Sequence, residues 1–216
     1  RSLRGDRDSH ASMMVNVTVK IDLIERVKLI IKEYVKELET EILVYASLPS
    51  ETAQKESKHI KNLYSVFLKS FPNINLSNKN KRCRFSWEEI QEELIATIGN
   101  VKIKSSSGGS SDTINFKDNN NKAKTYIVVG GFTLSRGFTM EGLMISYLYR
   151  TSKAMDTLYQ MGRWFGYRVG YEDLCHLYLE ETTKDYFIAT VRATENIMTQ
   201  VRQMNRRGSS PKEFGL

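Results

Sequence analysis

Two short segments of the chain carry arginines that could bind phosphate groups. The first is an apolar stretch followed by a glycine-rich turn that contains Arg136 and Gly137. The second lies further along the chain and contains Arg163 and Arg168. The planar guanidinium group of arginine holds two anionic oxygens at once, which suits it to a phosphate presented by another surface. The sequence therefore predicts a phosphate-binding role for these arginines.

The pattern before Arg136 predicts how that arginine is positioned. Residues 127–129 are apolar and indicate a buried strand, and Gly130 and Gly131 follow directly. Open α/β sheets place ligand contacts beyond the carboxyl ends of their strands. Glycine there lets the backbone approach a ligand closely. Two glycines alone indicate only a tight turn, but Arg136 on the same loop favours a phosphate contact.

Three polar residues around Arg136 each have two interpretations. The hydroxyls of Thr133 and Ser135 could contact the phosphates of a nucleic-acid backbone, or they could cap the turn. The carboxylate of Glu141 could orient a ribose hydroxyl or pair with an arginine of the second segment. It could equally cap the short segment near Met140.

The second segment is predicted to be the end of a helix over 153–165. Gln160 and Arg163 are three residues apart and would share a helix face. Gly162 lowers helix stability by ~1 kcal/mol relative to alanine, which indicates that packing or a contact requires it. The alternative for Arg163 is a surface salt bridge, which would contribute little.

The two segments resemble motifs V and VI of superfamily-two helicases and ATP-dependent translocases. Residues 126–143 and 160–168 are closer still to the Z1 domain family, the helicase-associated domain of bacterial restriction-type ATPases. Residues 10–18 resemble the opening strand of that family, and 211–216 resemble its closing signature. The resemblance covers most of the chain, although the stretch between Pro49 and Asn100 contains no recognisable motif.

The resemblance implies that residues 1–216 form one RecA-like second lobe of a motor, which shares ATP and Mg²⁺ with an N-terminal RecA-like lobe of the same polypeptide. It implies contact with the DNA backbone and a nuclease domain or subunit as a partner. The implied catalytic residues are Arg163 and Arg168. The implied ATP-binding residues are Gly131, Arg136, Gly137, Glu141 and Gln160. The implied nucleic-acid-binding residues are Thr133, Ser135 and Arg136.

Two positions depart from the general helicase pattern. Thr139 stands where an acidic residue is expected, and Glu141 follows two positions later. Arg168 lies five residues after Arg163, where the common helicase spacing is three. Either arginine could therefore be the one that contacts the transferring phosphate.

The sequence also lacks half of an ATP site. It contains no Gly-x-x-x-x-Gly-Lys-[Ser/Thr] loop and no apolar strand that ends in an acidic pair for magnesium. We therefore expect the chain alone not to hydrolyse ATP. The rival hypothesis is a helicase-derived module that binds DNA or a protein without ATP coupling. A third is a nuclease with an unrecognised acidic site.

Composition narrows the class of protein further. At 216 residues, with 40% hydrophobic and 26% charged residues, the chain fits one ordinary globular domain. A net charge of +7 and a pI near 9.3 suit a polyanionic partner. Cys83 and Cys175 form no spaced cluster, which indicates a reducing, cytoplasmic setting without zinc. No apolar run reaches membrane-spanning length, and the chain is expected to be a fragment of a longer polypeptide.

Strands that alternate with helices predict an α/β fold with a largely parallel sheet covered on both faces. Capping-box patterns begin helices at Asp22 and Ser86, and a further helix follows Pro49. Residues 50–98 form a predicted helical insertion. The expected strands are 13–19, 101–104, 127–129, 143–149 and 174–179. The other expected elements are a long helix to Ile42, a last helix over 183–204, a loop over 72–84, a serine–glycine linker over 105–111 and a flexible loop over 105–123.

Overall fold

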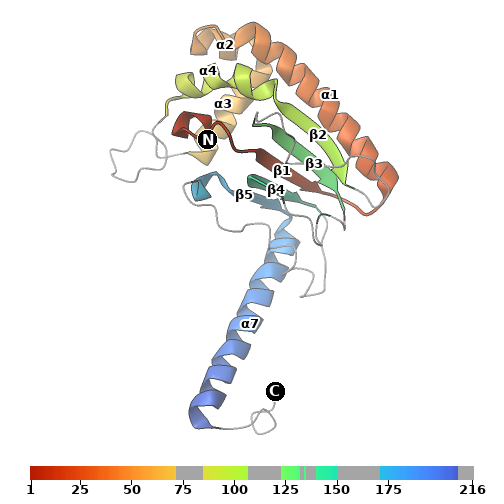
Figure 1. Ribbon diagram of the computed structural model, residues 1–216, viewed down its shortest axis with the longest axis vertical. Helices are drawn as coiled ribbons and strands as arrows, with labels where there is room; N and C mark the ends of the chain where they lie inside the picture. The colour runs from red at the N-terminus through yellow and green to blue at the C-terminus, as the bar shows by residue number, and fades with distance from the viewer. Residues whose placement is uncertain (72–84, 107–122, 132–133, 135–139, 150–170, 209–216) are drawn as a thin grey trace.

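The computed structural model describes residues 1–71, 85–106, 123–131, 134, 140–149 and 171–208 (Figure 1). Its strands are β1 (Ala11–Asn16), β2 (Val101–Ser106), β3 (Thr125–Gly130), β4 (Leu143–Leu148) and β5 (His176–Leu179). Its α-helices are α1 (Ile21–Tyr45), α2 (Ser50–Glu56), α3 (Lys58–Ser70), α4 (Trp87–Ile98) and α7 (Glu181–Arg207). Short 3-10 helices, η1 (Ser2–Arg4) and η2 (Glu172–Leu174), precede β1 and β5.

The strands form one five-stranded sheet in the order β2-β3-β1-β4-β5, and every pair is parallel. The first strand in sequence therefore lies in the middle of the sheet. Asn16 at the end of β1 is level with Gly130 of β3 and Leu148 of β4, so these strands end at one common edge. The expected α/β class with a parallel sheet is confirmed.

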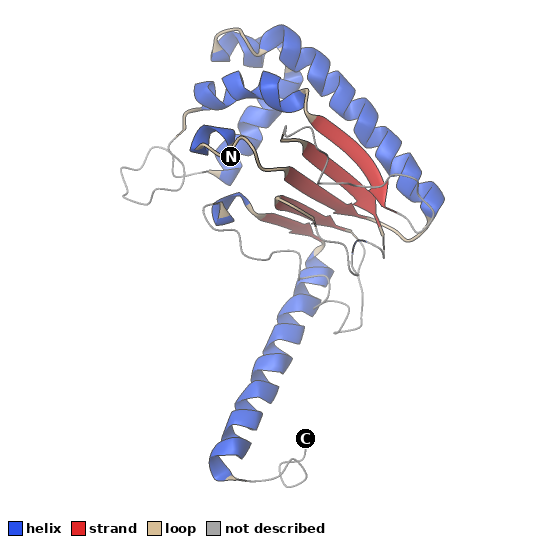
Figure 2. Ribbon diagram, in the orientation of Figure 1, coloured by secondary structure: helices blue, strands red, loops and turns tan. Residues whose placement is uncertain are grey.

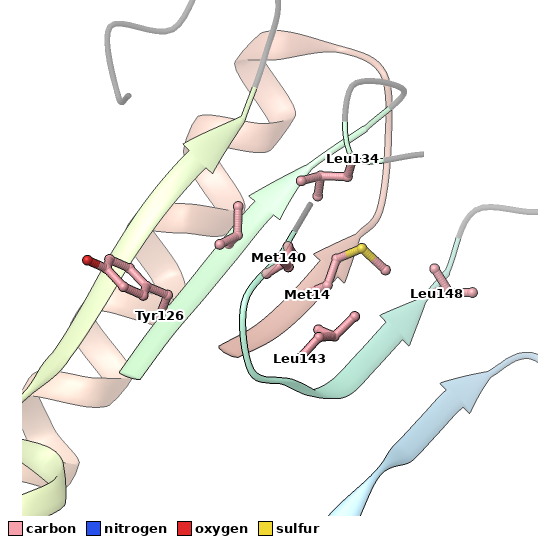
Figure 3. Close-up of a cluster of buried hydrophobic side chains, with 7 residues drawn as sticks. Met14, Tyr126, Leu134, Met140, Leu143 and Leu148 are labelled. Carbon is pink, nitrogen blue, oxygen red and sulfur yellow. The ribbon is translucent and has the colours of Figure 1, made fainter. Parts of the chain in front are cut away.

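Alternate residues of the strands fill two separate cores. On one face, Met14 and Val128 pack with Leu134, which follows β3, and with Phe187 from the start of α7 (Figure 3). On the other face, Val15 and Val129 pack against Ile24 of α1. Helix α1 lies along the Val15 face of the sheet (Figure 2), whereas the described cover of the Met14 face comes from Leu134, Met140 and the first turns of α7.

The helices between α1 and β2 form a third core against the end of α1. Ile42 of α1 packs there with Ile60, Phe67 and Trp87, and the rings of Phe67 and Trp87 lie 5.6 Å apart. Gln91 is a buried polar residue of this core, and its side-chain amide is fully hydrogen-bonded. It donates to two backbone carbonyls of the α1–α2 turn and accepts a hydrogen bond from the Trp87 indole.

Of the two capping boxes expected from the sequence, the structure contains one. Ser86 and Glu89 form the expected capping box at the start of α4. The capping box expected at Asp22 is wrong: α1 begins one residue earlier, its N-cap is Lys20 without a side-chain hydrogen bond, and Asp22 lies in the first turn. There Asp22 still interacts favourably with the helix dipole.

The serine run after residue 104 is a second correction. Ser105 and Ser106 were expected to open a linker, but they complete β2, level with Val129 and Gly130 of β3. Ser105 is buried and its hydroxyl accepts a hydrogen bond from Lys28 of α1. Strand pairing and this side-chain contact decide the conformation, whereas composition indicated a loop. Residues 107–122 and the predicted helix over 153–165 lie outside the described part of the chain.

Gly142 provides a test of how tightly β4 is fitted to β1. Its φ is +62°, and a Cβ atom there would lie 1.7 Å from the carbonyl oxygen of His10. We expect Gly142→Ala to lower the free energy of unfolding by ~1–3 kcal/mol or more, because backbone strain and the clash add together. Chemical denaturation measures the loss.

Gly99→Ala is the matched control for that change. Gly99 ends α4 in a right-handed helical conformation, and a Cβ atom there would meet nothing closer than 3.9 Å. Gly99→Ala should leave the free energy of unfolding unchanged or raise it by ~0.4–1 kcal/mol, because alanine lowers the conformational entropy of the unfolded chain. Equal effects from both substitutions would contradict the close fit at Gly142.

Candidate functional site

The edge at which β1, β3 and β4 end is the place where an open α/β sheet can bind a ligand. The segments that leave the three strands are joined by backbone hydrogen bonds. Val17 after β1 donates to Gly130 of β3 at 3.4 Å, and Tyr149 after β4 donates to Asn16 of β1 at 3.0 Å. The three strand ends are therefore held in register where the segment that contains Arg136 begins.

Gly131 lies at this edge, but its lack of a side chain serves the fold. The residue is buried, and a Cβ atom there would lie 2.2 Å from the carbonyl oxygen of Thr18. The sequence interpretation expected the backbone here to approach a phosphate. The described contact is an approach to the chain's own backbone, in the segment that follows β1.

The segment after Gly131 is anchored by two buried apolar residues that the sequence interpretation did not single out. Leu134 is 1% exposed, its backbone N–H donates to the Gly131 carbonyl at 3.2 Å, and Met140 is 6% exposed. Both side chains belong to the core around Met14 (Figure 3). The signal for them was available, since each is an apolar residue among polar and glycine neighbours. These anchors bracket the stretch that contains Arg136 and Gly137.

Most of the residues with expected roles lie outside the described part of the chain, so their roles stay predictions. They are Thr133, Ser135, Arg136, Gly137, Gln160, Arg163 and Arg168.

Glu141 is described, and the structure does not bring it to Gly131. The hydroxyl of Ser12 donates to the Glu141 carbonyl at 2.6 Å, which places Glu141 beside the start of β1. Gly131 follows the end of β3, next to the residues after β1. At roughly 3.3 Å per strand residue, the length of β1 separates them by about 20 Å. A single nucleotide contact with both residues is not supported by this arrangement.

The opposite, amino edge of the sheet has a cavity of about 370 Å³. Its lining includes Arg1, Asp6, Arg7 and Glu93, which pair with one another: Arg1 donates to Asp6 at 2.9 Å and Arg7 to Glu93 at 2.7 Å. The hydrogen bond from Arg1 holds the pKa of the Asp6 carboxyl below its ordinary value. Cations that are already neutralised in this way make a poor phosphate site.

A serine, a glutamate and a histidine meet where α3 packs on α1, although no such set was recognised in the sequence. The hydroxyl of Ser57 donates to the Glu41 carboxylate, and His59 Nδ1 lies 2.8 Å from its other oxygen. Ser57 is 1% exposed and also accepts the backbone N–H of Ile60 as the N-cap of α3.

This arrangement is not that of a hydrolase. In a catalytic triad, the histidine lies between the nucleophile and the acid so that it can take the proton of the serine. Here the carboxylate of Glu41 lies between Ser57 and His59, so His59 is not placed to take the proton of the Ser57 hydroxyl. The contacts of Ser57 and His59 with Glu41 therefore join the start of α3 to α1. Ser57 also ends the single expected helix after Pro49, which becomes α2 and α3.

Among the residues that the structure describes, no group of three or more His, Cys, Asp or Glu side chains could hold a metal ion. In the same part of the chain, no helix is both long enough and apolar enough to cross a membrane.

Comparison with known proteins gives one match. The family model described as "Z1 domain" matches residues 1–216. No curated protein and no solved structure matches the chain.

The contact between Ser57 and Glu41 predicts a pH-dependent stability difference. The hydrogen bond from Ser57, aided by His59, lowers the pKa of the Glu41 carboxyl. A lowered folded-state pKa stabilises the fold above the unfolded-state pKa, about 4.3 for glutamate, and that contribution is lost as the pH falls through the folded-state value. We therefore expect Glu41→Gln to be less stable than wild type at neutral pH, and the difference to shrink in acid.

Urea denaturation of both proteins at a series of pH values measures this difference. Glu39→Gln is the matched control, because it removes the same charge from the same helix two residues away from Glu41. A stability difference for Glu41→Gln that stays constant from neutral pH to below pH 4 would contradict the stabilising role of the ionised carboxylate.

Proposed function

The chain belongs to the Z1 domain family, and from this membership and its parallel sheet we propose that it is the second motor lobe of a helicase-like ATP-dependent DNA translocase or restriction endonuclease. The observation that carries the proposal is the anchoring of the segment that follows β3. Gly131 and the buried Leu134 fix this segment at the edge where three parallel strands end, and Arg136 follows two residues later.

The proposed site lies between this lobe and an N-terminal RecA-like lobe of the same polypeptide. ATP with Mg²⁺ would supply the transferable phosphoryl group there. Arg163 or Arg168 would bind the phosphate oxygens and stabilise their charge, and Gln160, Arg136 and Gly137 would take part in holding the nucleotide. These assignments rest on the motifs alone. Gly131 supports the site as a packing residue, and Glu141 is no longer assigned to it because of its distance from this edge.

On the same lobe, we propose that Arg136, with the hydroxyls of Thr133 and Ser135, contacts the DNA backbone. Such contacts position a protein on DNA without reading its sequence. A nuclease domain or subunit would complete a restriction endonuclease.

A second candidate is a helicase-derived module that binds DNA or a protein without ATP coupling. Two described contacts favour it: Gly131 is used against the segment after β1, and Glu141 lies at the other edge of the sheet. Both residues had been expected at the nucleotide. The two candidates differ in whether the arginines of the second segment affect ATP turnover.

We expect the chain to bind duplex DNA without sequence preference and with a strong dependence on salt, because phosphate contacts release counterions. Arg136→Ala should weaken binding to all sequences alike and reduce the slope of log K against log salt by about 1. Fluorescence anisotropy over a salt series measures both quantities.

Arg7→Ala is the matched control for DNA binding, because Arg7 is an exposed arginine of the amino edge, paired with Glu93. It should leave the salt slope unchanged. Binding that does not respond to salt, or equal losses from the two substitutions, would show that Arg136 makes no specific phosphate contact.

In the polypeptide that contains both lobes, Arg163→Ala or Arg168→Ala should lower kcat for ATP by roughly 10³-fold, with little change in nucleotide affinity. An arginine finger acts on charge that develops in the transition state, so its loss affects kcat more than binding. Lysine should restore little activity, because it lacks the bidentate fork. Steady-state kinetics and nucleotide binding test both variants, and an unchanged kcat in both would leave the second candidate.

A further inference from the structure

Residues 1–9, which we call the N-terminal strap, lie at the amino edge of the sheet between α4 and η2 (Figure 1). Arg7 of the strap pairs with Glu93 of α4, and Arg4 pairs with Asp173 of η2. Helix α4 leads into β2 and η2 leads into β5, and these are the two edge strands of the sheet. The strap therefore connects the two sides of the sheet across its amino edge.

The contacts on the η2 side have a specific geometry. Arg4 Nη1 and Nη2 each donate to one carboxylate oxygen of Asp173, at 2.9 and 2.6 Å. The two side chains are mostly buried, with 22% and 18% exposed. The guanidinium carbon of Arg1 lies 4.4 Å from the centroid of the Tyr171 ring, which is a cation–π arrangement. Bidentate pairs of this kind are among the strong hydrogen-bonded contacts of proteins.

The strap is held by charge and not by an apolar core. No residue of η1 is buried. The cavity of about 370 Å³ is lined by the strap together with α4 and residues 123–125, so the strap does not pack closely along the sheet. Within the strap, Arg1 donates to Asp6 at 2.9 Å and to the His10 carbonyl at 2.7 Å. A segment with little apolar burial opens at a lower free-energy cost than a core strand does.

Strand β5 has few other attachments. It has four residues, and among the described strands it pairs with β4 alone. Leu177 and Tyr178 are exposed, so burial of side chains contributes little to holding it. At its carboxyl end it leads into α7, whose Phe187 packs on the sheet. At its amino end, the described attachment is η2 and its contacts with the strap.

We propose that the N-terminal strap is a charge latch, which holds β5 on the sheet and opens when the contact between Arg4 and Asp173 breaks. With the latch closed, the chain from η2 to α7 is held at both ends. With the latch open, β5 keeps its pairing with β4 but detaches more readily, while β1 and β3 stay packed. Tyr171 follows Arg168 by three residues, so the latch also holds the chain next to the second arginine segment. The proposal does not depend on ATP or DNA binding.

Hydrogen exchange of the full chain, followed by mass spectrometry, tests the latch. Arg4→Ala should speed exchange of the β5 amides by about tenfold, because two hydrogen bonds between charged groups are lost. Exchange in β1 and β3 should not change. Arg26→Ala is the matched control, because it removes an exposed arginine of α1, and it should alter neither region. Unchanged exchange in β5, or an equal acceleration in all strands, overturns the latch.

A double-mutant cycle assigns the effect to the pair of Arg4 and Asp173. Asp173→Ala should speed exchange in β5 as Arg4→Ala does, and the combined variant should exchange no faster than either, because one contact is lost in all three. Rising salt should speed β5 exchange in the wild type more than in Arg4→Ala, because salt screens the charges that close the latch. Additive effects of the two substitutions, or the same response to salt in both proteins, overturn a latch closed by this pair.

Discussion

The structure depends on the central position of β1 in the sheet. This strand is hydrogen-bonded to β3 on one side and β4 on the other, and Met14 and Val15 are buried in opposite cores. Its partner strands follow more than a hundred residues later in the sequence, so the sheet can form only when distant segments meet. Such non-local pairing needs a close fit at both ends of the strand, because loop-closure entropy opposes it.

Glycines provide that fit on both ends of β1. Gly142 leaves room for the His10 carbonyl just before the strand, and Gly131 leaves room for the Thr18 carbonyl just after it. Gly131 and Gly142 therefore lie at opposite ends of β1. Leu134 and Met140, from the segment between them, pack on the Met14 face. Both glycines that flank the segment with Arg136 therefore serve packing against the residues next to the central strand.

The sequence predicted those elements whose signals are local. The long helix up to Ile42 and the capping box at Ser86 depend on neighbours three or four residues apart, and both are present. The serines after residue 104 were misinterpreted because only β3 and Lys28, which are distant in sequence, make them a strand. The break at Ser57 was missed for a related reason, since Glu41 of α1 is its partner. Long-range contacts override weak local preference.

In the candidate site, too, local sequence signals were informative and long-range contacts were not foreseen. Gly131 was expected to allow a close approach to a ligand because it follows a buried strand, but the atom that lies close to it belongs to Thr18. The family resemblance grouped Glu141 with Gly131 at the nucleotide, and the two are ten residues apart in sequence. A segment of that length can span the sheet, and Glu141 lies beside the start of β1. Sequence distance alone therefore could not place the two residues at one edge or at opposite edges.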